Sequence, residues 1–96
     1  MIGPKEAETI AAAYLAQLEA DGCPRLKITK VQKEAFGWVF FYQSEEYLLS
    51  GKLSDALAGN APFAVLRSSG DVEIFGTAMP SDFYIAEMNA KLEGEG

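Results

Sequence analysis

A short aromatic run near the middle of the chain constrains the fold more than any other feature. Residues 36–42 read Phe-Gly-Trp-Val-Phe-Phe-Tyr, and aromatic and β-branched side chains of this kind favour β-strands. Strand side chains alternate between the two faces of a sheet, which puts four aromatic residues on one face: Phe36, Trp38, Phe40 and Tyr42. Val39 and Phe41 then point to the other face. A strand that is apolar on both faces predicts a central position in a sheet.

Three further strands are predicted around this run. Residues 26–33 alternate in part and carry Lys27, Lys30 and Lys33, which suits an outer strand protected from pairing with other molecules. Residues 63–67 and 72–75 flank Ser68-Ser69-Gly70-Asp71, a short connection that is typical of a β-hairpin. We expect all four strands to form one antiparallel sheet in sequential order.

Helices are predicted at both ends of the chain. Gly3-Pro4 begins the first helix, and its apolar residues recur on one face until Asp21-Gly22 ends it. Pro80-Ser81-Asp82 begins the last helix, whose apolar side runs to Leu92. One or two helical turns are expected within residues 45–62.

The element order α-β-β-β-β-α predicts an α+β fold, with a four-stranded antiparallel sheet on which an N-terminal and a C-terminal helix pack. In this arrangement the aromatic stripe that contains Trp38 forms the core beneath the two helices. The alternative is that part of the stripe is exposed and contacts a protein partner. The 96 residues fit one domain over residues 1–92, followed by a frayed acidic tail at 93–96.

The residue types present argue against chemistry. The chain has no histidine, and Cys23 is its only cysteine, which excludes an intrachain disulfide and the usual zinc sites. The carboxylates of Glu45-Glu46 suit a solvated turn better than a catalytic pair. No catalytic residue, metal or cofactor is therefore predicted. Without a signal peptide or a bilayer-spanning apolar run, we expect a cytoplasmic protein with no membrane partner.

The net charge of −6 is unevenly distributed. Five basic and five acidic residues cancel up to Ala35, whereas three basic residues oppose nine acidic ones from Phe36 onward. An acidic body repels nucleic acid, so the aromatic stripe is not expected to stack bases. It attracts basic partners, although solubility alone would also explain the charge.

Several segments in order resemble a known family. They are Gly37 to Tyr42, Tyr47-Leu48, Leu57 to Phe63, Gly70, Gly76-Thr77-Ala78 with Pro80, and Tyr84-Ile85. Together they are similar to the YrhB-like family, also classed as immunity protein family thirty-five. The resemblance implies a small α+β protein from bacterial polymorphic-toxin loci, encoded beside the toxin that it is thought to neutralise. Some relatives resemble stand-alone stress or chaperone-like proteins, and no catalytic residues come with the family.

The family motif is interpreted structurally. Gly59-Asn60 is expected to make a turn, Pro62 to rigidify the entry to a strand, and Gly76-Thr77 to turn the chain toward the last helix.

The leading hypothesis is an immunity protein that covers the active site of a cognate toxin. The alternative is a chaperone-like or stress-related protein that stabilises a client enzyme, and an enzyme with an unrecognised site is a third class. The exposed candidates for partner contact are Glu45, Glu46, Tyr47, Asp55, Asp71 and Glu73. The sequence leaves the oligomeric state and the identity of the toxin open.

Overall fold

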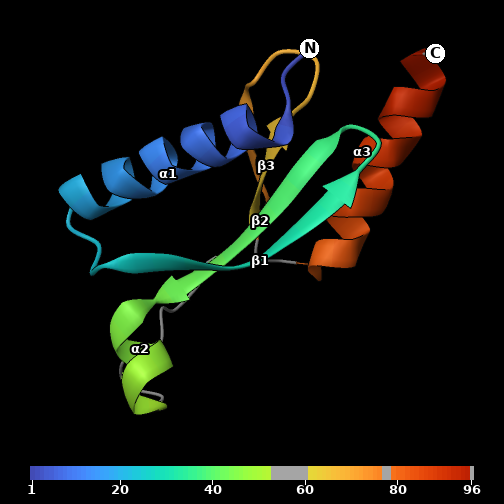
Figure 1. The fold of residues 1–96 in the computed structure, drawn as a ribbon. Helices are drawn as coiled ribbons and strands as arrows, with labels where there is room; N and C mark the ends of the chain where they lie inside the picture. Colours follow the sequence, from blue (N-terminus) through green and yellow to red (C-terminus); the bar gives the residue numbers. More distant parts are fainter. Residues whose placement is uncertain (53–60, 77–78, 96) are drawn as a thin grey trace.

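The computed structural model, which describes residues 1–52, 61–76 and 79–95, has the predicted α+β architecture (Figure 1). The helices are α1 (Pro4–Ala20), α2 (Glu45–Ser50) and α3 (Ser81–Glu95). The strands are β1 (Leu26–Glu34), β2 (Gly37–Ser44), β3 (Phe63–Leu66) and β4 (Val72–Ile74). They form one antiparallel sheet in the order β1-β2-β3-β4, so the predicted sheet, its sequential order and the central position of the aromatic strand are confirmed.

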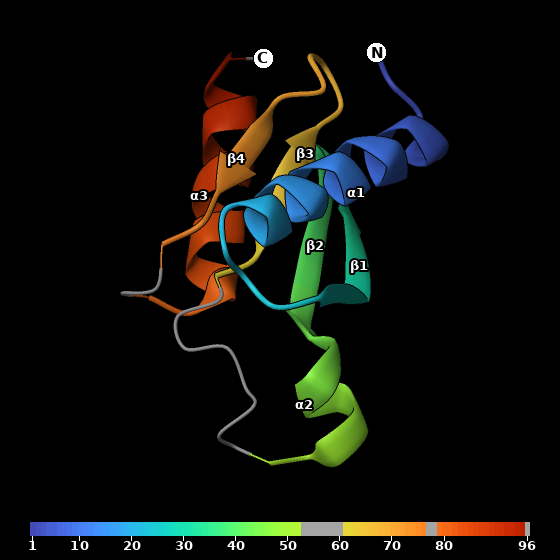
Figure 2. The same ribbon diagram turned by 90° about the vertical axis from the view of Figure 1, so that its left-hand side faces the viewer.

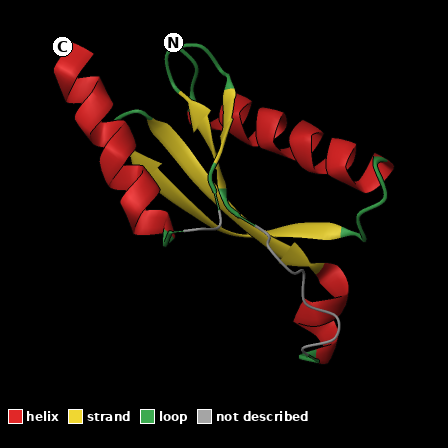
Figure 3. Ribbon diagram, turned by 180° about the vertical axis from the view of Figure 1, so that it is seen from behind, coloured by secondary structure: helices red, strands yellow, loops and turns green. Residues whose placement is uncertain are grey.

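The two long helices cover opposite faces of the sheet (Figures 2 and 3). On one face, α1 packs its small and apolar residues Ala7, Ala11 and Leu15 against β2 and β3. The buried partners from the two strands are Trp38, Phe40, Phe63 and Val65. The predicted burial of Trp38 is confirmed, but its cover is α1 alone and not both helices.

The α3 face has its own core, and here one prediction is wrong. Phe36 was expected beside Trp38, but it packs with Val39, Phe75 and Ile85 beneath α3. The strand alternation does not reach Phe36, because this residue lies in the turn before β2 and the next residue, Gly37, has a φ of +153°. The aromatic stripe of the α1 face therefore begins at Trp38.

Gly37 also lets β3 approach β2 closely. A side chain at this position would overlap the carbonyl oxygen of Val65, on the neighbouring strand. Just beyond, the Arg67 N–H donates to the Phe36 carbonyl oxygen over 2.8 Å. Glycine is thus required here for both its backbone conformation and the space that it leaves.

The predicted outer position of the lysine-bearing strand is confirmed, since β1 forms one edge of the sheet. Its pairing with β2 shifts between Ile28 and Lys30, and the Lys30 ammonium lies 5.3 Å from the centre of the Phe41 ring. At its end the Glu34 carboxylate accepts a hydrogen bond of 3.2 Å from the Asn89 side chain. This bond ties α3 to the first hairpin.

Element boundaries differ from the predictions by a few residues. The first strand continues to Glu34, and the helical backbone of α3 continues to Glu95, past the predicted end at Leu92. The hairpin of β3 and β4 forms as predicted, with the Leu66 N–H donating to the Asp71 carbonyl oxygen. Within the described residues, no helix combines the length and the apolar character that crossing a membrane requires.

Two positions of the family motif, Pro62 and Gly76, lie among the described residues. The Pro62 carbonyl oxygen accepts the Phe75 N–H over 3.0 Å, which joins the entry of β3 to the exit of β4. Gly76 lies against the Tyr84 ring, because a side chain there would come within 2.5 Å of the Tyr84 hydroxyl oxygen. Gly59, Asn60 and Thr77 lie outside the described residues.

Candidate functional site

The structure separates the predicted partner-contact residues into two groups. Glu45, Glu46 and Tyr47 lie on α2, at one end of the sheet, whereas Asp71 and Glu73 belong to the hairpin of β3 and β4. Figure 2 shows α2 and the turn of this hairpin at opposite ends of the molecule, whose longest extent is 45 Å. The sixth candidate, Asp55, lies outside the described residues.

The α2 group is presented on a short, well-capped helix. The Ser44 hydroxyl oxygen accepts the Tyr47 N–H over 3.1 Å, and Gly51 ends the helix in the left-handed conformation with a φ of +69°. The Glu45 N–H donates to the Arg25 carbonyl oxygen, which holds the helix against the start of β1. The side chain of Leu49 is 83% exposed, so this group combines acidic and apolar surface.

The hairpin group borders a groove. This groove, of about 490 Å³, lies between α3, the β3–β4 hairpin and the β1–β2 turn, and we call it the hairpin groove. Its apolar side chains include Phe36, Leu66, Phe75, Tyr84 and Met88, and Ile74 lies at its border. Its charged lining consists of Arg67, Glu73, Glu87 and Lys91.

Local packing sets the shape of the hairpin groove. Phe75 and Tyr84 stack with ring centres 5.6 Å apart, and the absence of a side chain at Gly76 lets the Tyr84 ring lie close to the strand exit. At the other end, Gly70 has a φ of +78° and its N–H donates to the Leu66 carbonyl oxygen. The ring stack thereby holds the exit of β4 beside α3, and the Gly70 hydrogen bond closes the turn that precedes β4.

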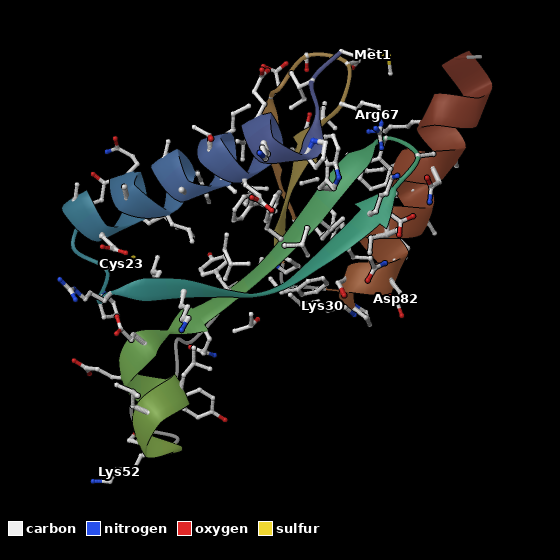
Figure 4. The ribbon with its side chains drawn as sticks, in the orientation of Figure 1. Met1, Cys23, Lys30, Lys52, Arg67 and Asp82 are labelled. Carbon is white, nitrogen blue, oxygen red and sulfur yellow. The ribbon has the colours of Figure 1, made fainter. Side chains whose placement is uncertain are left out.

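The charge of Arg67 is already engaged within the protein. The carbon atom of its guanidinium lies 4.5 Å from the centre of the Trp38 ring, and the same group donates to the Glu34 carbonyl oxygen over 3.3 Å. Its backbone carbonyl oxygen accepts the Ile2 N–H. Figure 4 places Arg67 at the turn between β1 and β2, so this residue joins three segments at the top of the sheet.

The charges at the mouth of the groove are more exposed. Glu73, Glu87 and Lys91 all have exposed side chains, and Asp71 is exposed in the adjacent turn. Contact with the Trp38 ring leaves the positive charge of Arg67 in place, so the two acidic and two basic side chains that line the groove balance, and Asp71 adds one acidic group beside it. The groove therefore presents an apolar floor with a rim of mixed charge, and its acidic groups at the hairpin are Asp71 and Glu73.

Two tyrosines on the α1 face have altered acidity. Burial raises the pKa of the Tyr14 and Tyr42 hydroxyls above the ordinary value of 10.0. Repulsion from the neighbouring Tyr14 and then from Cys23 adds to the rise for Tyr42, and repulsion from Cys23 adds to the rise for Tyr14. The centre of the Tyr14 ring lies 4.5 Å from that of Phe63, and neither hydroxyl is activated as a base by this environment.

Among the described residues, no three histidine, cysteine, aspartate or glutamate side chains gather as a metal site.

Sequence reasoning missed most of the hairpin groove, including Arg67, Tyr84, Glu87 and Lys91. One signal was present, because the α3 residues of the groove, Tyr84, Glu87, Met88 and Lys91, follow the spacing of a single helix face. Of the five predicted contact residues that the structure describes, only Glu73 lines the groove.

Comparisons with known proteins place these observations in a family. The profile of a family described as Immunity protein 35 matches residues 5–87. A curated relative, the uncharacterised protein YrhB of Escherichia coli (strain K12), is 38% identical over 55 residues. That alignment covers 57% of this chain and 58% of the relative, so the chain matches little more than half of the relative's length. No solved structure matches.

Proposed function

Because the chain belongs to the immunity protein 35 family, we propose that it is a non-enzymatic binding protein that neutralises a cognate bacterial toxin. The observation that carries this proposal is the family match over residues 5–87, which includes both strands of the hairpin and the first half of α3. The toxin is a domain encoded by a neighbouring gene, and the two proteins meet in the cytoplasm.

Inhibition occurs by occlusion: the protein docks over the active site of the toxin and excludes its substrate. This mechanism requires surface complementarity and no reactive group, which agrees with the residue types of the chain. An interface of the usual size buries on the order of 800 Å² on each partner. The hairpin groove supplies an apolar centre of the kind that dominates binding energy, with charged residues at its rim.

Acidic groups favour a basic partner surface. Toxins that act on nucleic acid or on other anionic substrates surround their active sites with basic residues, and the exposed Asp71, Glu73 and Glu87 suit such a surround. The acidic residues of α2, Glu45 and Glu46, add to the field from the other end of the sheet. Because Glu45 and Glu46 lie far from the groove, they act on the approach of the toxin and not in the buried contact.

A chaperone-like role is the second candidate, and the observation that favours it is exposed apolar surface. Leu49 is 83% exposed and Ile74 is 64% exposed. Surface of this kind also binds unfolded clients. The two functions differ in range, because a chaperone protects unrelated proteins and an immunity protein protects against its own toxin.

Co-expression tests the proposal. The toxin domain from the neighbouring gene is induced in cells with and without this protein, alongside an unrelated toxin domain as the matched control. We expect growth to be restored against the neighbouring toxin only. Cell death in both strains contradicts the immunity function, and protection of a heat-aggregating unrelated enzyme by the purified protein establishes the chaperone-like one.

A further inference from the structure

The free edge of β4 lies beside the hairpin groove. In the described part of the chain, β4 has a strand neighbour on one side only, which is β3. The Leu66 N–H bonds the Asp71 carbonyl oxygen and the Phe75 N–H bonds the Pro62 carbonyl oxygen. Since alternate residues of an antiparallel strand bond the same neighbour, Val72 and Ile74 direct their N–H and C=O groups to the open side.

Side chains on the two faces of β4 differ in character. Ile74 pairs with Phe63 and therefore points to the α1 face, where it remains 64% exposed. Glu73 pairs with Ala64, which belongs to the α3 core, and Glu73 accordingly faces the hairpin groove. A strand added at this edge would meet the apolar Ile74 side chain on one face and the Glu73 carboxylate, at the border of the groove, on the other.

We propose that β4 is the docking edge for an extended, basic strand of the toxin, which continues the sheet and places its basic side chains over the hairpin groove. This inference rests on the proposed function and specifies how the partner binds. Backbone hydrogen bonds to Val72 and Ile74 supply the register. The alternating side chains supply the specificity, with basic residues toward Glu73 and Glu87 and apolar residues toward Ile74.

Charge selects this partner over a second copy of the chain. A two-fold antiparallel pairing that uses the outward groups of both Val72 and Ile74 sets Glu73 directly opposite Glu73 of the other copy. Like charges in that position are destabilising. A basic strand reverses the sign of the same contact.

The opposite edge of the sheet is protected against pairing. β1 carries Lys27, Lys30 and Lys33, and its register shifts between Ile28 and Lys30. Lysines and irregular pairing are the usual means of blocking an edge strand, and a basic toxin segment is repelled there. The two edges therefore offer a docking position and a matched control within one protein.

Val31 is the control residue on β1. The Arg67 N–H donates to the Phe36 carbonyl oxygen. The backbone N–H and C=O groups of even-numbered residues in β2 therefore point toward β3, and those of odd-numbered residues point toward β1. Gly37, Val39 and Phe41 pair with Glu34, Gln32 and Lys30, which leaves the N–H of Val31 on the open side. Its side chain is 45% exposed, so it matches Ile74 in residue class, exposure and amide direction.

Amide hydrogen exchange, followed by NMR on the free protein and on its complex with the toxin domain, tests the docking edge. We expect the Val72 and Ile74 amides to exchange rapidly in the free protein and to become protected in the complex, while the Val31 amide stays unprotected. A complex in which the β4 amides keep their free exchange rates overturns this inference and leaves the proposed function standing. Failure of the wild-type protein to bind the toxin domain overturns both.

Substitutions give an independent reading. Proline removes the outward N–H without loss of a bond to β3, so Ile74→Pro is expected to weaken toxin binding by about tenfold or more, and Val31→Pro to leave it within about twofold. Ile74→Ala keeps the backbone N–H and removes most of the side chain, so it measures the contribution of the side chain alone. It should weaken toxin binding less than Ile74→Pro does. Equal affinities for Ile74→Pro and Val31→Pro, both folded by circular dichroism, contradict the docking edge. Protection of the Ile74 amide that rises with the concentration of the free protein identifies a second copy as the occupant and also contradicts it.

Discussion

The Arg67 guanidinium lies over the Trp38 ring, 4.5 Å from its centre, and so joins the β3–β4 turn to the beginning of β2. Trp38 is buried beneath α1, whereas Arg67 is half-buried at the end of β3 and lines the hairpin groove. The pair therefore connects the core of the α1 face to the groove near α3. It also orients Arg67, which with Lys91 supplies the basic side chains of the groove lining in the described part of the chain.

Trp38 is expected to dominate the stability of the α1 face. Truncation by Trp38→Ala should lower the free energy of unfolding by about 3–5 kcal/mol, because it leaves a cavity under the helix. In a double-mutant cycle with Trp38→Leu and Arg67→Ala, the coupling energy should be about 0.5–2 kcal/mol. Denaturant unfolding measures both. Unchanged unfolding of Trp38→Ala together with lost toxin binding would show that this residue is an exposed contact.

Gly37 should tolerate no side chain. Gly37→Ala combines a φ of +153° with overlap between the new methyl group and the Val65 carbonyl oxygen, so the free energy of unfolding should fall by at least about 2 kcal/mol. Gly51→Ala is the matched control, since Gly51 also has positive φ but, among the described residues, no atom within 4 Å of the added carbon. Its cost should be about 1 kcal/mol. Similar losses for the two variants would remove the close approach of β3 as the cause.

Alkaline pH should weaken the fold through two tyrosines. Burial raises the pKa of Tyr14 and Tyr42 above 10.0, so between the unfolded and folded pKa values the unfolded chain binds fewer protons than the folded protein. Their contribution to stability is complete below pH 10 and is lost as the pH rises through the folded pKa values. Ultraviolet titration should show tyrosines that ionise late, and Tyr42→Phe should flatten the alkaline fall in stability. An equally steep fall in this variant would assign the effect to other groups.

Electrostatic steering should set the rate of association with the toxin. Reversal of Glu45, Glu46, Asp71 and Glu73 to Lys should slow association and weaken its dependence on salt, since exposed rim charges act mainly on encounter. Reversal of Lys5, Lys27 and Lys30 to Glu is the matched control and should have much less effect. Stopped-flow kinetics at two salt concentrations make the comparison. Equal rates for the acidic-set variant and the wild type would show that the acidity serves solubility.

Much of the fold follows from side-chain alternation within single segments. The run after Gly37 is apolar on both faces and forms a central strand, and the lysines of β1 mark an edge. The alternation does not extend to Phe36, because Gly37 turns the backbone between Phe36 and Trp38. It also does not say which helix covers which face, since both helices have an apolar side.

The site was harder to predict than the fold. Glu73 was recognised as exposed, but the hairpin groove joins segments far apart in the chain, from Phe36 to Lys91. The engagement of Arg67 by Trp38 depends on the pairing of β2 with β3 and on the turn at Phe36. Spacing along α3 marks one helix face, and only the folded sheet shows what that face meets.

A titration of toxin activity tests the central claim most directly. The purified protein is added in steps to the toxin domain encoded by the neighbouring gene, and the catalytic activity of that domain is measured at each step. Occlusion of the active site predicts that activity falls in proportion to the added protein and reaches zero near equimolar amounts. Full toxin activity in the presence of an excess of bound protein would contradict the account.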